Sequence, residues 1–250
     1  MSAKAPSFDR EALIADLENA GFVPDSYDLT AVDRLRQIIA TRMTQTARDV
    51  PHFPVTMDIM LDALMAARTQ HNAAHDAVRI SINDLVIKAA AVALMAVPEL
   101  NSSYRPEAIV AHRTADIAVV VAIPDGLMTP IIRNAQDKPV TEIAEEVRHL
   151  SARAQTRQLR PGEYTGGTFS ISNLGMYGVT SFGSIINQPH GAILSVGAAR
   201  QIVIPEKGEF RAGQAMTCTL TCDHRVVDGV TGARWMQAFK AAIEEPQHLF

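Results

Sequence analysis

AMTCTLTCDHRVVDG (Ala215–Gly229) is the stretch of sequence that decides the fold. Its first ten residues alternate between threonines and a second, mostly apolar set, and this period of two predicts a strand. The second set comprises Met216, Cys218, Leu220 and Cys222. His224 continues that face where the strand ends, and Asp228 and Gly229 stand at the start of a helical pattern. The sequence therefore predicts His224 at a rigid strand-to-helix junction.

Two interpretations of this junction are open from these residues alone. His224 is either a catalytic base or an ordinary histidine at the end of a strand. Asp228 is well suited to cap the helix that follows, because aspartate is a favoured N-cap residue. A histidine four residues before an aspartate and a glycine also recurs by chance, so the rest of the chain has to decide.

Strand and helix patterns alternate irregularly along the chain, and strands dominate its second half. SIND (Ser81–Asp84) resembles a capping box and opens an apolar helix over Leu85–Met95, which is predicted to be the buried central helix. Ala115–Gly126 reads as one strand rich in β-branched residues, and Gly191–Ile204 predicts further strands. These patterns predict an α/β fold with a mixed sheet.

The first 30 residues differ from the rest of the chain. A short helical pattern over Asp9–Ala20 ends at Gly21, and Pro24-Asp25-Ser26 then breaks the chain. We predict an N-terminal arm or linker over 1–30, packed on a main domain over 31–250.

Composition excludes several classes of function. A formal net charge of -4 is not that of a nucleic-acid-binding protein. The longest apolar run, Leu85–Val97, contains Lys88 and is too short to cross a bilayer, which needs about 20 residues. Cys218 and Cys222 lie four residues apart on one strand face, so we predict that both are residues of the core and form neither a disulfide nor a metal site. This use of cysteine is typical of a protein in a reducing compartment.

DHRVVDG (Asp223–Gly229) resembles the DHRxxDG signature of the dihydrolipoamide acyltransferases, the E2 components of the 2-oxo acid dehydrogenase complexes. Six further segments match that family in order and spacing, over about residues 30–250. They are RQIIATRM (36–43), PHF (51–53), SINDLVIKAAA (81–91), VPELNSSY (97–104), AVVVAIPDGLMTPIIRNA (118–135) and GGTFSISNLGMYG (166–178). Condensation domains of peptide synthetases share the wider HxxxDG theme, but they usually carry a second histidine where this chain has Asp223.

The resemblance implies a chloramphenicol acetyltransferase-like two-layer α/β fold, in which helices pack on a mixed β-sheet. It also implies acyl transfer between dihydrolipoamide and coenzyme A, with coenzyme A as a substrate. A thiol with a pKa near 8.5 needs a base at neutral pH, and histidine is suited to that task. His224 is the expected general base.

The family also suggests roles for other residues. A hydroxyl residue of its TFTISNLG segment donates a hydrogen bond to the oxyanion, and Ser172 is the residue that corresponds here. Thr168, Ser170 and Ser172 share one face of the predicted strand, so a solvated strand face is the alternative. Asp228 is expected to hold the loop around His224, by pairing with an arginine such as Arg36 or Arg42.

Substrate-binding roles are expected for Asn173, Asp125 and Gly126, because in the family the loop at 125–126 lies near the coenzyme A channel. A plain turn is the alternative for that loop. His52 is expected either at a trimer contact or as an exposed strand histidine.

The loop SNLGMYG (172–178) resembles that of acetyl-transferring members more than that of succinyl- or branched-chain-transferring ones. We therefore expect the pyruvate dehydrogenase type, although Gln188, Pro189 and His190 depart from the usual N-P-P-Q. A non-catalytic structural core subunit, or a succinyl or branched-chain acyltransferase, is the alternative function.

The resemblance implies a homotrimer whose active site is shared between subunits, and trimers that assemble into cores of 24 or 60 chains. Leu249-Phe250 is either a tail that docks into a neighbouring trimer or a frayed end. The expected partners are a lipoyl-bearing domain and the E1 and E3 enzymes of the complex, in the bacterial cytoplasm or the mitochondrial matrix. Asp137-Lys138 is followed by Pro139 rather than by alanine, so the lipoyl group is expected on a separate or missing domain.

Overall fold

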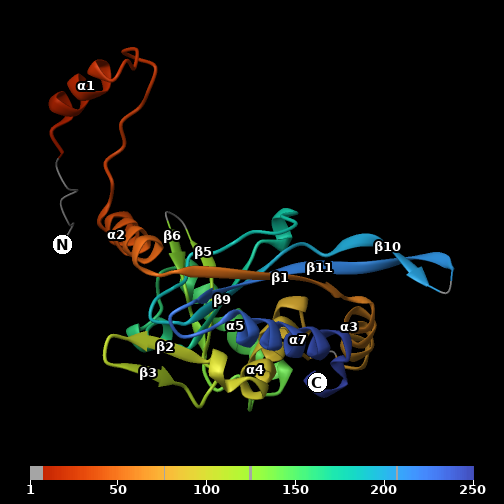
Figure 1. Cartoon of the computed structure of the whole chain (residues 1–250). Helices are drawn as coiled ribbons and strands as arrows, with labels where there is room; N and C mark the ends of the chain where they lie inside the picture. Colours follow the sequence, from red (N-terminus) through yellow and green to blue (C-terminus); the bar gives the residue numbers. More distant parts are fainter. Residues whose placement is uncertain (1–7, 76, 124–125, 207) are drawn as a thin grey trace. The chain divides into compact units, whose positions relative to one another are not determined.

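A mixed sheet forms the centre of the computed structural model, which describes residues 8–75, 77–123, 126–206 and 208–250 (Figure 1). The strand order is β1-β11-β9-β8-β4-β7, and β10 pairs with β11. The strands are β1 (His52–Met60), β4 (Ile117–Val119), β7 (Ile131–Ile132), β8 (Phe169–Asn173), β9 (Ala192–Val196), β10 (Arg200–Glu206) and β11 (Glu209–Asp223). β8 runs parallel to both of its neighbours, β4 and β9, while β11 is antiparallel to β1, β9 and β10.

Helices pack on one side of this sheet. They are α3 (Asp62–Ala74), α4 (Ile82–Ala96), α5 (Val140–Gln155) and α7 (Gly229–Glu244). The chain also forms the short helix α6 (Pro161–Tyr164) and the 3₁₀ turns η1 (Pro98–Leu100), η2 (Gly175–Tyr177) and η3 (Pro246–Leu249). Figure 1 shows α4, α5 and α7 gathered on the same side of β1 and β11. The predicted α/β fold with a mixed sheet and packed helices is confirmed.

The central helix α4 begins as predicted. Ser81 Oγ accepts a hydrogen bond from the backbone of Asp84 at 3.2 Å, and the Asp84 carboxylate accepts one from the Ser81 backbone at 2.8 Å. This capping box satisfies two backbone donors that the helix cannot pair internally. Most of the helix is buried, which agrees with its nearly uniform apolar sequence.

The opposite face of the sheet is covered by the segment over residues 179–190. Ile186 packs with Val50 and Ile193, and its backbone N–H donates to His52 Nε2 at 3.0 Å. The segment passes so close to the end of β9 that a Cβ on Gly197 would lie 2.0 Å from the carbonyl oxygen of Thr180. Both faces of the central strands are therefore buried.

One predicted strand is wrong in its extent. Ala115–Gly126 does not form a single strand: β4 ends at Val119, and β5 (Val121–Ile123) pairs with β6 (Gly126–Met128) in a separate hairpin. Val120 still donates to the carbonyl oxygen of Ile171 in β8 at 2.9 Å, and the chain leaves the main sheet after this residue. A run of β-branched residues cannot reveal that change of partner. A second hairpin joins β2 (Ser102–Arg105) to β3 (Ala108–Ala111).

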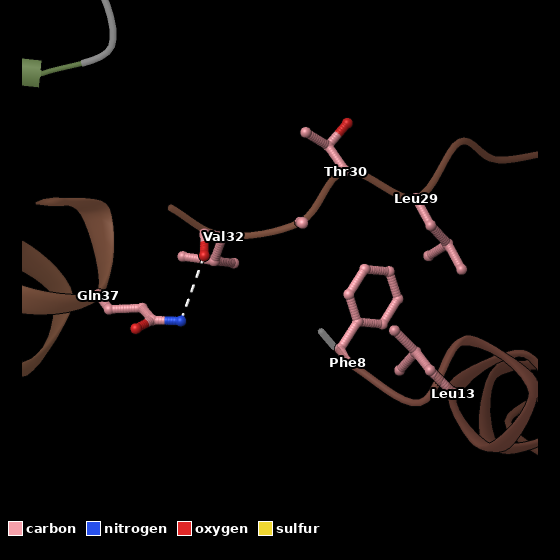
Figure 2. Close-up of a pocket in the computed structure, with 7 residues that line it drawn as sticks. Phe8, Leu13, Leu29, Thr30, Val32 and Gln37 are labelled. Carbon is pink, nitrogen blue, oxygen red and sulfur yellow. Dashed lines mark hydrogen bonds between the residues drawn. The ribbon is translucent and has the colours of Figure 1, made fainter. Parts of the chain in front are cut away.

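The chain divides into two compact units, Met1–Gln45 and Thr46–Phe250. In the first unit, α1 (Arg10–Asn19) is capped by Asp9, and α2 (Arg34–Asp49) begins, continuing into the second unit. Figure 2 shows a small open pocket of about 300 Å³ in this unit, lined by Phe8, Leu13, Leu29, Thr30, Ala31, Val32 and Gln37. Among the described residues, no acidic, basic or histidine side chain lines this pocket. The predicted boundary after residue 30 stays a prediction.

Candidate active site

His224 lies on the turn that follows β11, as the alternating pattern predicts. Its backbone N–H donates to the carbonyl oxygen of Pro51 at 3.0 Å, which ties the turn to the start of β1. Its imidazole is exposed and meets the ring of Phe53 edge to face, with 4.9 Å between the ring centroids. An accessible imidazole on a fixed backbone can accept a proton from a substrate.

The residues on either side of His224 form an ion pair that the sequence reasoning missed. Arg225 donates Nε to Asp223 Oδ1 at 2.9 Å and Nη2 to Asp223 Oδ2 at 2.7 Å. The Asp223 carboxylate is buried, and it holds the pKa of Arg225 above its usual value through this hydrogen bonding. The opposite charges two residues apart were the available signal, but only the fold shows that they meet.

Asp228 caps α7, as its sequence position suggests. Its Oδ1 accepts a hydrogen bond from the backbone of Thr231 at 2.7 Å, and this bond lowers the pKa of Asp228, with a smaller contribution from the charge of His224. The expected pairing with Arg36 or Arg42 stays a prediction, because both arginines belong to the first unit.

Gly229 lies against the same aromatic ring as His224. A Cβ on this residue would lie 3.2 Å from Phe53 Cε1 and 3.3 Å from Phe53 Cζ. Glycine therefore allows close packing here.

Ser172 differs from the two hydroxyl residues that precede it on the same face of β8. Ser170 is fully buried and bonds His190 Nδ1 at 2.7 Å, and Thr168 accepts from the backbone of Asp116 at 3.2 Å. The solvated-face alternative is therefore wrong for Thr168 and Ser170. Within the described residues, Ser172 is partly exposed and its hydroxyl has no hydrogen-bond partner, so it remains able to donate to a ligand.

The three residues expected to bind substrate lie in different settings. Asn173 is committed to its own surroundings: its amide donates to Asn83 Oδ1 at 3.0 Å, and its oxygen accepts from the backbone of Gly175 at 2.8 Å. Gly126 opens β6 and is partly exposed. Asp125 lies outside the described residues.

Strand register separates Ser172 from His224 within one chain. Ser172 pairs with Ser195 of β9, and Ser195 pairs with Thr219 of β11, which is five residues before His224. Five residues of extended strand span about 17 Å, and two strand spacings add about 9–10 Å across the sheet. These two side chains therefore cannot act on the same atom within one copy of the chain.

The family model for the catalytic domain of the 2-oxoacid dehydrogenase acyltransferases matches residues 24–250. The chain belongs to this family. The expectation drawn from DHRVVDG and the other matching segments is thus confirmed.

Two curated relatives of this acyltransferase illustrate the match. The chain is 45% identical over 231 residues to the dihydrolipoyllysine-residue acetyltransferase component of the pyruvate dehydrogenase complex of Rhizobium meliloti, covering 90% of this chain and 52% of the relative. It is 41% identical over 222 residues to component 2 of the mitochondrial enzyme of Arabidopsis thaliana, covering 86% and 41%. The acyltransferase chain spans about half the length of the curated relatives it matches.

Solved structures agree on the fold. The dihydrolipoamide acetyltransferase of Azotobacter vinelandii matches with a TM-score of 0.87 and 28% identity over 99% of both chains, and its crystal structure was used to study a serine, a histidine and an asparagine in its catalytic mechanism. A probable dihydrolipoamide acetyltransferase of Listeria monocytogenes matches with a TM-score of 0.83 and 27% identity, covering 88% of this chain and 95% of the other. Chloramphenicol acetyltransferase, at 17% identity and a TM-score of 0.51, covering 82% and 92%, shares the fold.

Other features of the acyltransferase chain narrow its chemistry. Cys218 and Cys222 are buried and unpaired, and burial raises the pKa of each thiol to about 12, so neither can act as a nucleophile near neutral pH. His52 is not an exposed strand histidine, because its Nδ1 bonds the Val50 carbonyl at 2.8 Å and its Nε2 accepts from Ile186. The described residues contain no group of three metal-ligating side chains that could hold an ion, and no helix among them is long and apolar enough to span a membrane.

Proposed function

We propose that this chain transfers an acetyl group between dihydrolipoamide and coenzyme A, as the core subunit of a pyruvate dehydrogenase complex. One observation carries the proposal: His224 stands exposed on a fixed turn, within the DHRVVDG sequence of a chain that belongs to the acyltransferase family. The acetyltransferase names of the relatives at 45% and 41% identity support the choice of acyl group.

His224 acts as the general base in this proposal. Its imidazole takes the proton from the attacking thiol, and the new thiolate adds to the carbonyl carbon of the acetyl thioester. The tetrahedral intermediate then collapses, the bond to the original sulfur breaks, and the departing thiolate takes the proton back from the imidazolium. Protons and electrons balance without any further reactant, and the reverse reaction follows the same steps.

Ser172 donates a hydrogen bond to the oxyanion of that intermediate. Its hydroxyl has no partner within the described residues, whereas Thr168 and Ser170 on the same face are engaged. The serine and histidine studied in the Azotobacter enzyme are 52 residues apart, and Ser172 and His224 have the same separation. The asparagine studied there follows the histidine by four residues, where this chain has Asp228, which we assign to holding the turn.

The complete site contains His224 of one copy and Ser172 of a neighbouring copy. The separation of about 17 Å along the strands within one chain supports this arrangement. Each copy carries His224 on one surface and Ser172 on another, so copies can pair these surfaces repeatedly and close into a ring. We propose that this ring is a homotrimer. The cubic core of a pyruvate dehydrogenase multienzyme complex, at 28% identity and a TM-score of 0.87 over 99% of both chains, supports assembly of trimers into a larger core of 24 or 60 chains.

The remaining assignments follow from the same function. Asn173, Asp125 and Gly126 line the route of coenzyme A, residues 31–250 form the catalytic domain, and residues 1–30 form an arm or linker. A lipoyl group on another domain or protein delivers the acetyl group, and the E1 and E3 enzymes complete the complex. Bacterial and mitochondrial relatives support the bacterial cytoplasm or the mitochondrial matrix as the compartment.

A direct assay tests the proposal. Acetyl-, succinyl- and isobutyryl-CoA are offered to the purified chain with free dihydrolipoamide, and the mass of the native assembly is measured in parallel. We expect acetyl transfer to be fastest and His224→Ala to lower kcat by about two to four decades. Full activity of His224→Ala would remove the base assignment, preference for another acyl group would correct the substrate, and no transfer with any of the three would indicate a structural core subunit.

A further inference from the structure

The turn that carries His224 is held at both flanks by one carboxylate. Asp223 is 3% exposed, and its Oδ1 accepts from both the backbone N–H and Nε of Arg225, at 3.0 and 2.9 Å. Its backbone carbonyl accepts from Val226 and Val227, both at 3.0 Å. The Arg225 guanidinium presents a planar fork to this carboxylate, and such paired bonds fix orientation as well as distance.

Arg225 also reaches two segments that are distant in the sequence. Its guanidinium carbon lies 4.0 Å from the centre of the Tyr104 ring of β2, a favourable cation–π geometry. Its Nη1 donates to the carbonyl oxygen of Asp49 at 3.5 Å, two residues before the Pro51 carbonyl that receives the N–H of His224. The side chain thus joins the end of β11 to β2 and to the approach to β1.

The imidazole of His224 is not held by contacts like those that fix Asp223 and Arg225. Within the described residues it makes no side-chain hydrogen bond, and its only ring contact is the edge-to-face one with Phe53. The carboxylate of Asp228, four residues after His224, accepts a hydrogen bond from the backbone of Thr231. The direction of the ring therefore depends on the conformation of the turn.

We propose that Arg225, seated on Tyr104, is a positioning residue that sets the orientation of His224 toward the substrate thiol. The proposal rests on the proposed acyl transfer. A displacement of about 1 Å at a reacting group can lower the rate about a hundredfold. By holding the turn, Arg225 therefore affects kcat rather than substrate binding. Arg225 also neutralises the buried Asp223 carboxylate that adjoins the base in the sequence.

Substitutions of Arg225 and Tyr104 test the proposal, and a substitution in a second ion pair of the chain serves as the control. Arg225→Lys keeps the charge and loses the fork, and Tyr104→Leu removes the ring beneath it. We expect each to lower kcat about 10- to 100-fold with both KM values within about twofold. Tyr104→Phe, which keeps the ring, should recover most of the activity lost in Tyr104→Leu.

Arg153→Lys is the control, because Arg153 also makes two bonds to one carboxylate, from Nη1 and Nη2 to Glu163 at 2.6 and 2.8 Å. It should lower the Tm and leave kcat unchanged. The ring signals of His224 in ¹H–¹³C spectra provide a readout that does not need activity: they should shift or broaden in Arg225→Lys and stay as in the parent in Arg153→Lys. Unchanged His224 signals with an unchanged kcat in Arg225→Lys would overturn the positioning role, whereas an inactive parent with shifted signals would overturn only the acyl-transfer proposal.

Discussion

Residues of the same chemical type have different roles at different positions of this molecule. Ser170 and Ser172 lie two residues apart on one face of β8, yet Ser170 is buried against His190, while the Ser172 hydroxyl has no hydrogen-bond partner in the part of the chain that the structure describes. The environment of each oxygen, and not the residue type, decides whether it supports the fold or meets a substrate. The same distinction separates the exposed His224 from the buried His190 and the engaged His52.

Ser172→Ala should lower kcat by about two to three decades with little change in KM, which is the typical loss of one oxyanion donor. Ser170→Ala is the matched control, because it leaves His190 Nδ1 without its buried partner and should lower the free energy of unfolding by about 1–3 kcal/mol. Steady-state kinetics and urea unfolding distinguish the two. A large rise in KM for Ser172→Ala would make it a binding residue instead.

At two positions, backbone segments pass so close to each other that only glycine fits. The segment over 179–190 crosses the end of β9 so tightly that Gly197 has no space for a side chain, and Gly191 is similarly blocked by the Ser102 carbonyl, 2.1 Å from its Cβ position. These crossings cover the second face of the sheet and bring His190 and Ile186 into place.

Gly197→Ala should therefore disrupt the fold. A Cβ 2.0 Å from the Thr180 carbonyl forces the backbone to move, and overpacking of this kind costs about 1–3 kcal/mol or more. Gly183→Ala, in the same segment but with no atom within 4 Å of the new Cβ, should have an unchanged Tm. Thermal unfolding followed by circular dichroism compares the pair, and equal Tm values would show that the crossing is looser than described.

The strand β11 also predicts a chemical property. Burial raises the pKa of Cys218 and Cys222 to about 12, so at pH 8 almost no thiolate is present and no reagent reaches it. Iodoacetamide should leave both thiols unmodified in the native protein and label both in urea. Rapid native labelling, detected by mass spectrometry, would contradict the packing of this strand.

At the scale of the whole molecule, the two residues of the proposed site do not meet within one copy of the chain. Five residues of strand and two strand spacings separate Ser172 from His224, so the proposed site needs a second copy. The C-terminal end bears on assembly too: Leu249 is buried in this chain's own core and Phe250 contacts His71 with 5.2 Å between ring centroids, so the frayed-end alternative does not hold. Phe250, 39% exposed, remains available to a neighbour.

Mixing two inactive variants tests the shared site. In trimers refolded or coexpressed from equal amounts of Ser172→Ala and His224→Ala, about a quarter of the interfaces combine an intact serine with an intact histidine. Acetyl transfer should therefore recover to about a quarter of the parent value, whereas each variant alone stays inactive. No recovery in mixed trimers of verified composition would mean that both groups act from one chain.

The sequence by itself determined the α/β class, the position of His224 at the end of a strand, the capping box at Ser81 and the family. Each of these depends on local periodicity or on a short ordered motif, which neighbouring residues are sufficient to encode. Only the tertiary structure decided that the chain leaves the main sheet after Val120 and that Asp223 and Arg225 hold the His224 turn against Tyr104. It also decided that, of the three hydroxyls, Ser172 alone has no hydrogen-bond partner among the described residues. Those outcomes depend on which distant strands become neighbours, and the register between β8, β9 and β11 is a property of the packed sheet rather than of any one segment.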